Sequence, residues 1–322
     1  MLNIVSLAIL IAVAVLLVSL SLRARRLRNG FLRWSGMGLA MICALALFLV
    51  GGLGIVGLVK AHTRSAPVPE LKVAGTPQQI QRGKAIADSF CGGCHSTTGT
   101  LTGGLDIGEK LPLPMGTFVA ANLTPAGQLS HWSDGEIFRA IRNGVDADGH
   151  WLTIMSYTNA GKLSDDDIQS LIAYLRSRPA AGQVTVNPPD SFSPLGIIML
   201  GAGMMPGGKP IIAGAITAPP KGPTVQYGDY ILSYQDCREC HGADLTGGVQ
   251  GQLAPLGPGL NVVKDWKLDQ FVATMRTGID PAGHQLSDEM PWRQMGKMDD
   301  DELTAIYQYL THMPEPQSTA AN

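Results

Sequence analysis

The first 60 residues contain no acidic residue, and most of them carry no charge at all. Residues 1–22 and 34–59 are uncharged runs rich in Leu, Ile, Val and Ala, each long enough to cross a bilayer as a helix. Five arginines between the runs predict a cytoplasmic loop, which places the N-terminus and everything after Lys60 on the opposite side. A cleaved signal peptide is the alternative, but it would have a shorter apolar run preceded by basic residues.

The rest of the chain lacks the patterns of several function classes. There is no basic patch with interleaved aromatic residues, which argues against nucleic-acid binding. There is also no nucleophile elbow and no phosphate-binding loop, so the sequence predicts no substrate chemistry of its own. Of the 24 basic and 26 acidic residues, 18 and 26 follow residue 60, which gives this part a formal charge of −8. The chain therefore divides into an apolar, basic anchor and an acidic globular part.

Cysteine is scarce, with five residues, and four of them form two C-x-x-C-H motifs. In this signature the two thiols bond to the haem vinyl groups and the histidine becomes the proximal iron ligand. Redox dithiols, or one shared four-cysteine zinc site, are the alternatives. The histidine after each pair and the long separation of the pairs favour two covalently bound c-type haems instead. The fifth cysteine, Cys43, is predicted to be a small apolar side chain of the second helix. The motif residues are Cys91, Cys94, His95, Cys237, Cys240 and His241.

The two motifs belong to a repeated module. The sequence before the first motif, at 81–90, resembles residues 226–236, and Leu-Thr-Gly-Gly at 101–104 recurs at 245–248. Residues 155–175 align without gaps on 290–310, where acids follow a cap residue and apolar residues recur at helical spacing. Each module is thus expected to run helix, haem motif, helix, methionine loop, helix.

The second axial ligand of each iron has several candidates. Methionine opposite histidine gives a six-coordinate electron carrier of relatively high potential. The repeat favours Met155 and Met290, because they share one aligned position ahead of the last helix. His150 and His284 also fall near each other in the repeat, but each directly follows a glycine in a turn and is interpreted as a solvated histidine. The other candidates are Met115 and His131 in the first module, and Met275, Met295 and Met298 in the second.

A family resemblance follows from these motifs. The C-x-x-C-H motif with a downstream methionine loop resembles class I cytochrome c. Asn-Leu-Thr-Pro at 122–125, the segment 132–145 and Met290-Pro-Trp resemble the cytochrome c subunits of membrane-bound alcohol and aldehyde dehydrogenases. Those subunits typically carry three haems and a C-terminal anchor, and Ser156 here replaces the usual proline after the ligand methionine. Two haems and an N-terminal hairpin are closer to the dihaem subunit of one class of haem-copper oxidase.

The sequence therefore predicts an all-α protein in which a transmembrane hairpin precedes two tandem class I cytochrome c domains. Its expected role is to relay single electrons between a quinol-oxidising complex or dehydrogenase and a terminal oxidase or soluble cytochrome. The alternative is a dihaem peroxidase with one open haem site. The expected segments are a hairpin at 1–60, a tether at 61–76, domains at 77–180 and 222–314, a Pro/Gly-rich connector at 181–221 and a tail at 315–322.

The expected partners are the bilayer and the other subunits of an electron-transfer complex in the respiratory or photosynthetic membrane. The haem domains are expected on the periplasmic side of the inner membrane. Acids at 165–167 and 299–302 are placed on the solvent side of the last helices, where they cap the helix or attract a basic soluble cytochrome. The connector contains an apolar stretch at 194–205, too short to span a bilayer and expected to pack on the haem domains or a partner.

Overall fold

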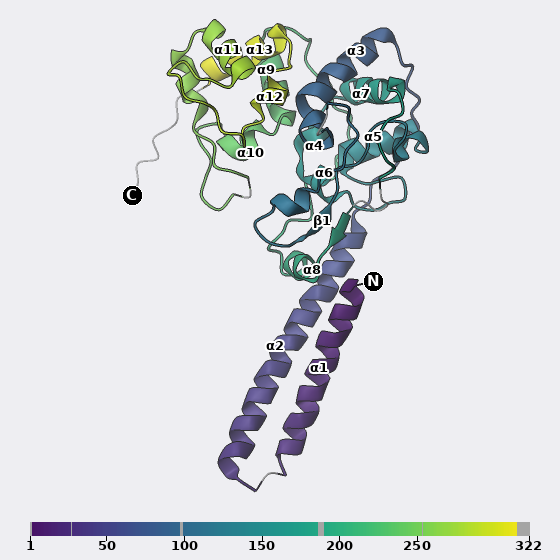
Figure 1. Ribbon diagram of the computed structural model, residues 1–322, viewed down its shortest axis with the longest axis vertical. Coiled ribbons are helices and arrows are strands. Elements are labelled where there is room, and N and C mark those ends of the chain that lie inside the picture. The colour runs from purple at the N-terminus through teal and green to yellow at the C-terminus, as the bar shows by residue number, and fades with distance from the viewer. Residues whose placement is uncertain (1, 27, 97–98, 186–189, 253, 314–322) are drawn as a thin grey trace.

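The computed structural model describes residues 2–26, 28–96, 99–185, 190–252 and 254–313. In these ranges the chain is mainly helical, with a long hairpin that extends away from two helical modules (Figure 1). The predicted all-α class is confirmed. The predicted tail at 315–322 lies outside the described residues.

The hairpin consists of α1 (Leu2–Ala24) and α2 (Gly30–Thr63), which pack against each other. Asn29 starts α2, because its side chain accepts hydrogen bonds from the first free backbone N–H groups of that helix. Both helices are long and apolar enough to cross a membrane, and α2 continues three residues past the predicted end of the hairpin. The start of α1 and the end of α2 lie at the same end of the hairpin, next to the modules (Figure 1).

The first module is built around a helix pair, α3 and α7. Ser164 caps α7 by accepting a hydrogen bond from Asp167 N, and the apolar stripe that follows is buried, as its spacing predicts. The elements of this module are α3 (Pro77–Ile86), the π-helical turn η1 (Ala87–Cys91), α4 (Gly92–His95), η2 (Ile107–Lys110), β1 (Gly116–Phe118), η3 (Gln128–Ser130), α5 (Asp134–Asn143), α6 (Thr153–Tyr157), η4 (Asn159–Lys162) and α7 (Asp165–Ser177).

The second module repeats this arrangement with α9 against α13. A Cβ atom at Gly228 of α9 would lie 2.1 Å from Ala305 O, and one at Gly83 of α3 would lie 1.9 Å from Ser170 O. Glycine at the same place in both copies lets each first helix cross its last helix closely. The elements are α9 (Val225–Tyr234), α10 (Cys237–His241), η5 (Leu260–Asp265), α11 (Leu268–Thr277), α12 (Trp292–Met295) and α13 (Asp300–Thr311).

The connector packs on the first module and the hairpin. Its strand β2 (Asp190–Phe192) pairs antiparallel with β1 of the first module. The helix α8 (Pro194–Gly201) follows directly and lies against α2, beside the end of the hairpin (Figure 1). The apolar connector stretch was expected to pack on the haem domains or on a partner, but its helix lies chiefly on the hairpin.

The two modules meet through a buried polar cluster centred on Arg82. The Arg82 guanidinium donates to Asp167 Oδ1 at 2.7 Å and, across the module boundary, to Glu302 Oε1 at 2.5 Å. Tyr230 of the second module also donates its hydroxyl to Asp167 Oδ2 at 2.6 Å. The placement of all these acids on the solvent side is therefore wrong for Asp167 and Glu302, which are 7% and 2% exposed.

Candidate haem site

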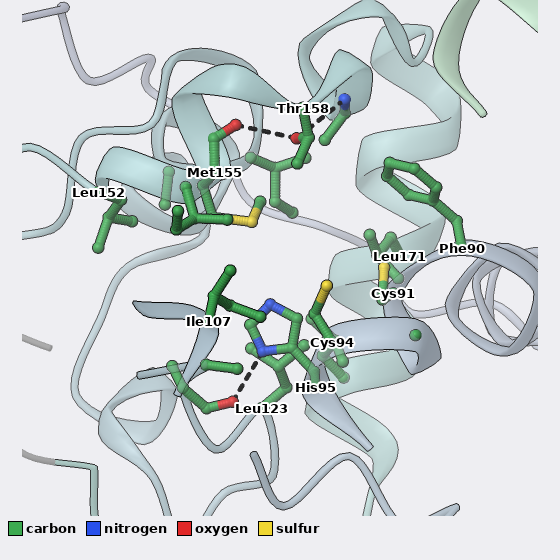
Figure 2. A pocket seen from close by; sticks show the side chains of 18 of the residues that line it. Phe90, Cys91, Cys94, His95, Ile107, Leu123, Leu152, Met155, Thr158 and Leu171 are labelled. Carbon is green, nitrogen blue, oxygen red and sulfur yellow. Dashed lines mark hydrogen bonds between the residues drawn. The ribbon is translucent and has the colours of Figure 1, made fainter. Parts of the chain in front are cut away.

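A cavity of about 280 Å³ opens in the first module between the C-x-x-C-H motif and the methionine loop (Figure 2). Its walls are mainly apolar side chains from the helices and loops of that module. Residues of α5, α7 and the segment 118–123 contribute to the lining. An apolar slot with a few sulfur and nitrogen atoms aimed into it suits a flat, largely hydrophobic macrocycle.

His95 stands in this cavity in an orientation set by its backbone partners. Its Nδ1–H donates to Ala121 O at 2.8 Å, and a carbonyl can only accept, so the other ring nitrogen carries the free lone pair. Its own carbonyl accepts a hydrogen bond from Gly103 N at 2.9 Å, which ties the motif to the Leu-Thr-Gly-Gly turn. Burial lowers the pKa of His95, although the bond to Ala121 opposes this. The ring is thus neutral at physiological pH and able to ligate a metal.

Met155, on α6, lies across the cavity from His95. Figure 2 shows its sulfur pointing into the space that His95 and the thiols of Cys91 and Cys94 also face. A Cys pair and a histidine on one side, with a thioether on the other, is the donor set of a six-coordinate c-type haem.

The other candidates of the first module do not line this cavity. Met115 is buried, and His131 is exposed. The His150 ring lies 3.1 Å from Asp146 Oδ2 within its turn, and His284 repeats this contact with Asp280 at 3.1 Å. The interpretation of His150 and His284 as turn residues therefore agrees with their placement.

The cysteines lie in surroundings that disfavour a zinc site. Burial raises the pKa of Cys91 and that of Cys237 each to about 12. In the described part of the chain, the one group of His, Cys, Asp and Glu close enough to hold a metal ion is Asp146, Asp148 and His150, which contains no cysteine. The four-cysteine zinc alternative is therefore discarded.

In the second module the histidine of the haem motif is held in the same way. His241 donates its Nδ1–H to Pro258 O at 2.7 Å, and its carbonyl accepts from Gly247 N at 2.8 Å, as in the first module. Met290 is half-buried against the core. The Trp292 indole N–H, two residues on, is buried without a partner among the described residues, which leaves a donor free for a bound polar group. The remaining methionine candidates, Met275, Met295 and Met298, are buried core residues.

Residues of the second module also line the cavity of the first module. The sequence did not predict this contribution. Gln235 and Asp236, just before the second haem motif, lie there together with Pro291 of the second methionine loop. Asp190 of the connector lines it as well. Burial raises the pKa of Asp236, and raises that of Asp190 to about 6. In the sequence, only the position of Asp236 next to Cys237 pointed to a role near a haem. No local pattern indicates that a residue of one module lines the cavity of the other.

Comparison with known proteins agrees with this geometry. The family described as Cytochrome C oxidase, cbb3-type, subunit III matches residues 78–175 and 228–310, more than half of the chain. A "Diheme cytochrome c-type" protein of Cereibacter sphaeroides is 26% identical over 301 residues, which cover 85% of this chain and 98% of that protein.

Subunits of dehydrogenases are similar as well. The cytochrome c subunit of the quinone alcohol dehydrogenase of Gluconobacter oxydans is 27% identical over 270 residues, covering 73% of this chain and 55% of that subunit. The fructose dehydrogenase cytochrome subunit of Gluconobacter japonicus is 29% identical over 141 residues, covering 42% of this chain and 27% of that subunit. The chain thus spans about half or less of these dehydrogenase subunits.

These findings agree with the motifs, the cavity and the apolar hairpin. The chain is a haem-binding c-type cytochrome of electron transport, and its two apolar helices indicate a membrane anchor. It belongs to the cytochrome c family described as Cytochrome C oxidase, cbb3-type, subunit III.

Proposed function

We propose that this chain is a membrane-anchored dihaem cytochrome c that relays single electrons inside a respiratory or photosynthetic complex. It would accept them from a dehydrogenase or quinol-oxidising partner and pass them to a terminal oxidase or soluble cytochrome. The observation that carries the proposal is Met155 facing His95 across an apolar cavity, in a module whose motifs are repeated. When bound, haem supplies an iron centre that changes by one electron.

The residues divide this work in the same way in both modules. Cys91 and Cys94 hold one haem covalently, and Cys237 and Cys240 hold the other. His95 and His241, each oriented by a backbone carbonyl, would ligate the irons through their free ring nitrogens. Met155 and Met290 would each supply a thioether as the second protein ligand.

A dihaem peroxidase, the alternative, needs one iron with an open coordination position. A methionine loop in both modules argues against that chemistry, because each loop carries a thioether that would fill the open position. The proposal is therefore an electron-transfer subunit without substrate chemistry of its own.

The acidic helix starts contribute less to partner attraction than their sequence indicates. Asp167 and Glu302 are paired with Arg82, and Asp165 with Arg142. Because internal cations neutralise these acids, we propose subunits of the same membrane complex, similar to the dehydrogenases of the relatives, as the principal partners. A basic soluble cytochrome remains a secondary acceptor.

We expect two haems to remain attached after the protein is denatured. The physical reason is that each C-x-x-C pair forms two thioether bonds, which survive unfolding. Intact-mass spectrometry of the denatured chain should show two haem additions.

The matched variants make the haem count specific to the cysteines. A C91A/C94A chain should carry one haem, whereas C43A should keep both, because Cys43 lies in the apolar helix α2. A wild-type mass with one haem, or a C91A/C94A chain with two, would contradict the proposal.

We expect both modules on the periplasmic side of the inner membrane. The arginine-rich loop between α1 and α2 is retained in the cytoplasm, so the hairpin returns the chain to the other side. An alkaline phosphatase fused after Asn322 should be active in whole cells, and the same reporter inserted between Arg25 and Arg26 should be inactive. The reverse pattern would refute this topology.

A further inference from the structure

The connector helix α8 is apolar all round but is covered by protein on one side only. Residues 194–206 contain no charged side chain. Gly196, Ile197 and Leu200 are buried, whereas Leu195 is 39% exposed, and Met204, just beyond the helix, is 66% exposed. A short helix that is hydrophobic all round needs an apolar environment for its outer face as well.

The covered side of α8 lies directly on the hairpin. A Cβ atom at Gly57 of α2 would lie 1.8 Å from Ile197 O, and one at Gly201 of α8 would lie 1.8 Å from Leu53 O. Glycine on both helices therefore brings the two backbones into contact. Lys60 Nζ then donates to Leu200 O at 3.1 Å, which joins the end of α8 to the top of α2.

The position of these contacts along α2 sets the depth of α8. The uncharged run of α2 ends at Val59, and Leu53 and Gly57 precede that end by six and two residues. At about 1.5 Å per residue, α8 crosses α2 roughly 3–9 Å inside the end of the run. Gly54, at the same level, faces Leu7 of α1, a few residues from the start of that helix. Helices that lie in a membrane interface are buried to about this depth.

We propose that α8 and the turn that follows it lie in the bilayer interface, with Leu195 and Met204 inserted among the lipids. This inference rests on the membrane anchor of the proposed function and goes beyond it, because it assigns a second, non-spanning membrane contact. The exposed apolar surface of α2 runs from Leu45, which is 71% exposed, to Ile55 and Val56 at the level of α8, which are 49% and 45% exposed. Lipid is the occupant that this continuity favours, since the bilayer that surrounds α2 also reaches the level of Leu53.

This contact would hold the first module at a fixed position on the membrane. Ser193 N, just before α8, donates to Met115 O at 2.9 Å, and the β1–β2 ladder ends at the same place. Asn3 at the start of α1 donates to Phe192 O at 2.8 Å. A bilayer-embedded α8 therefore connects the lipid surface to the haem cavity through a short, hydrogen-bonded segment.

The test compares single cysteines in the full-length haem-loaded protein, in phosphatidylcholine nanodiscs and in a C43A background. L195C and M204C report on α8, L45C is the lipid-facing reference, and V249C is the water-facing reference, because Val249 is 65% exposed in the second module. Reaction with a water-soluble maleimide is followed by mass spectrometry. We expect L195C and M204C to react at least tenfold more slowly than V249C, as L45C does. A photoactivatable phosphatidylcholine should form adducts on the segment that contains these residues.

Each other outcome has a definite meaning. Labelling of L195C and M204C as fast as V249C, with L45C protected, overturns the lipid contact but leaves the anchor intact. Protection accompanied by cross-links between two copies, without lipid adducts, overturns it in favour of a protein contact. Rapid labelling of L45C would show that the anchor itself is wrong. Haem absorbance is measured on every sample, so that a misfolded variant is recognised by its lost haem. L195C and M204C are two independent tests of the same contact.

Discussion

Replacing Met155 or Met290 by histidine is expected to lower the reduction potential of one haem and leave that of the other nearly unchanged. A thioether opposite histidine stabilises the reduced iron more than a second imidazole does. Axial ligands and their surroundings span about 0.8 V, so a decrease on the order of 0.1 V or more is expected for the substituted centre. Redox titration followed by haem absorbance gives both potentials.

Matched methionines in the same module separate ligation from packing. Met295 and Met298 are 4% and 1% exposed and lie in the core, so M295L and M298L should change stability more than potential. The weak far-red band of sulfur-to-iron ligation should halve in M155H and in M290H and persist in M295L. If M290H keeps both potentials and the whole band, the distal ligand of the second haem lies elsewhere.

The repeat explains why the ligand candidates could be selected from sequence. His95 and His241 belong to a local motif, and the shared alignment position of Met155 and Met290 removes most of the other methionines. Both kinds of information lie within one module. The helices α7 and α13 follow from their caps and apolar spacing for the same reason.

Contacts between modules could not be predicted in this way. Arg82 and Glu302 are 220 positions apart, and nothing near either residue states that they pair. The acids of α7 and α13 have the pattern of solvated helix starts, yet one acid of each helix turns inward because a cation from α3 reaches both. The docking of α8 on α2 likewise depends on glycines in distant segments, whose pairing appears only when the backbones meet.

Replacing Arg82 by methionine is expected to be among the most destabilising single substitutions in the two modules. Its guanidinium is the partner of Asp167 and Glu302, whose side chains are 10% and 3% exposed. Without the cation, two carboxylates remain buried close together with no compensating charge. Breaking a buried ion pair from one side costs about 3–5 kcal/mol. Urea unfolding of the haem-loaded chain in mild detergent, followed by circular dichroism, measures the loss.

The neighbouring Lys84 provides the matched control on the same helix. Its pair with Asp88 is largely solvated, with side chains 60% and 30% exposed, so K84M should change the free energy of unfolding by about 0.5 kcal/mol or less. The triple variant R82M/D167N/E302Q removes the stranded charges while keeping amide oxygens as acceptors for the Tyr230 hydroxyl and for the backbone N–H of Asp299 at the α13 cap. It should recover most of the stability lost in R82M.

R82M, K84M and the triple variant also show whether the polar cluster centred on Arg82 holds the two modules together. If it does, R82M should make the connector at 181–221 more sensitive to limited proteolysis, because the modules separate more often. The triple variant also lacks the cation, so its connector should be as sensitive as that of R82M. If the triple variant recovers its free energy of unfolding but not its resistance to the protease, the charge of Arg82 joins α3 to α13, and hydrogen bonding of the buried polar groups alone does not. If R82M is no more sensitive than K84M, the modules are held instead by apolar contacts such as the edge-to-face pair of Phe90 and Tyr234, whose ring centres are 6.0 Å apart.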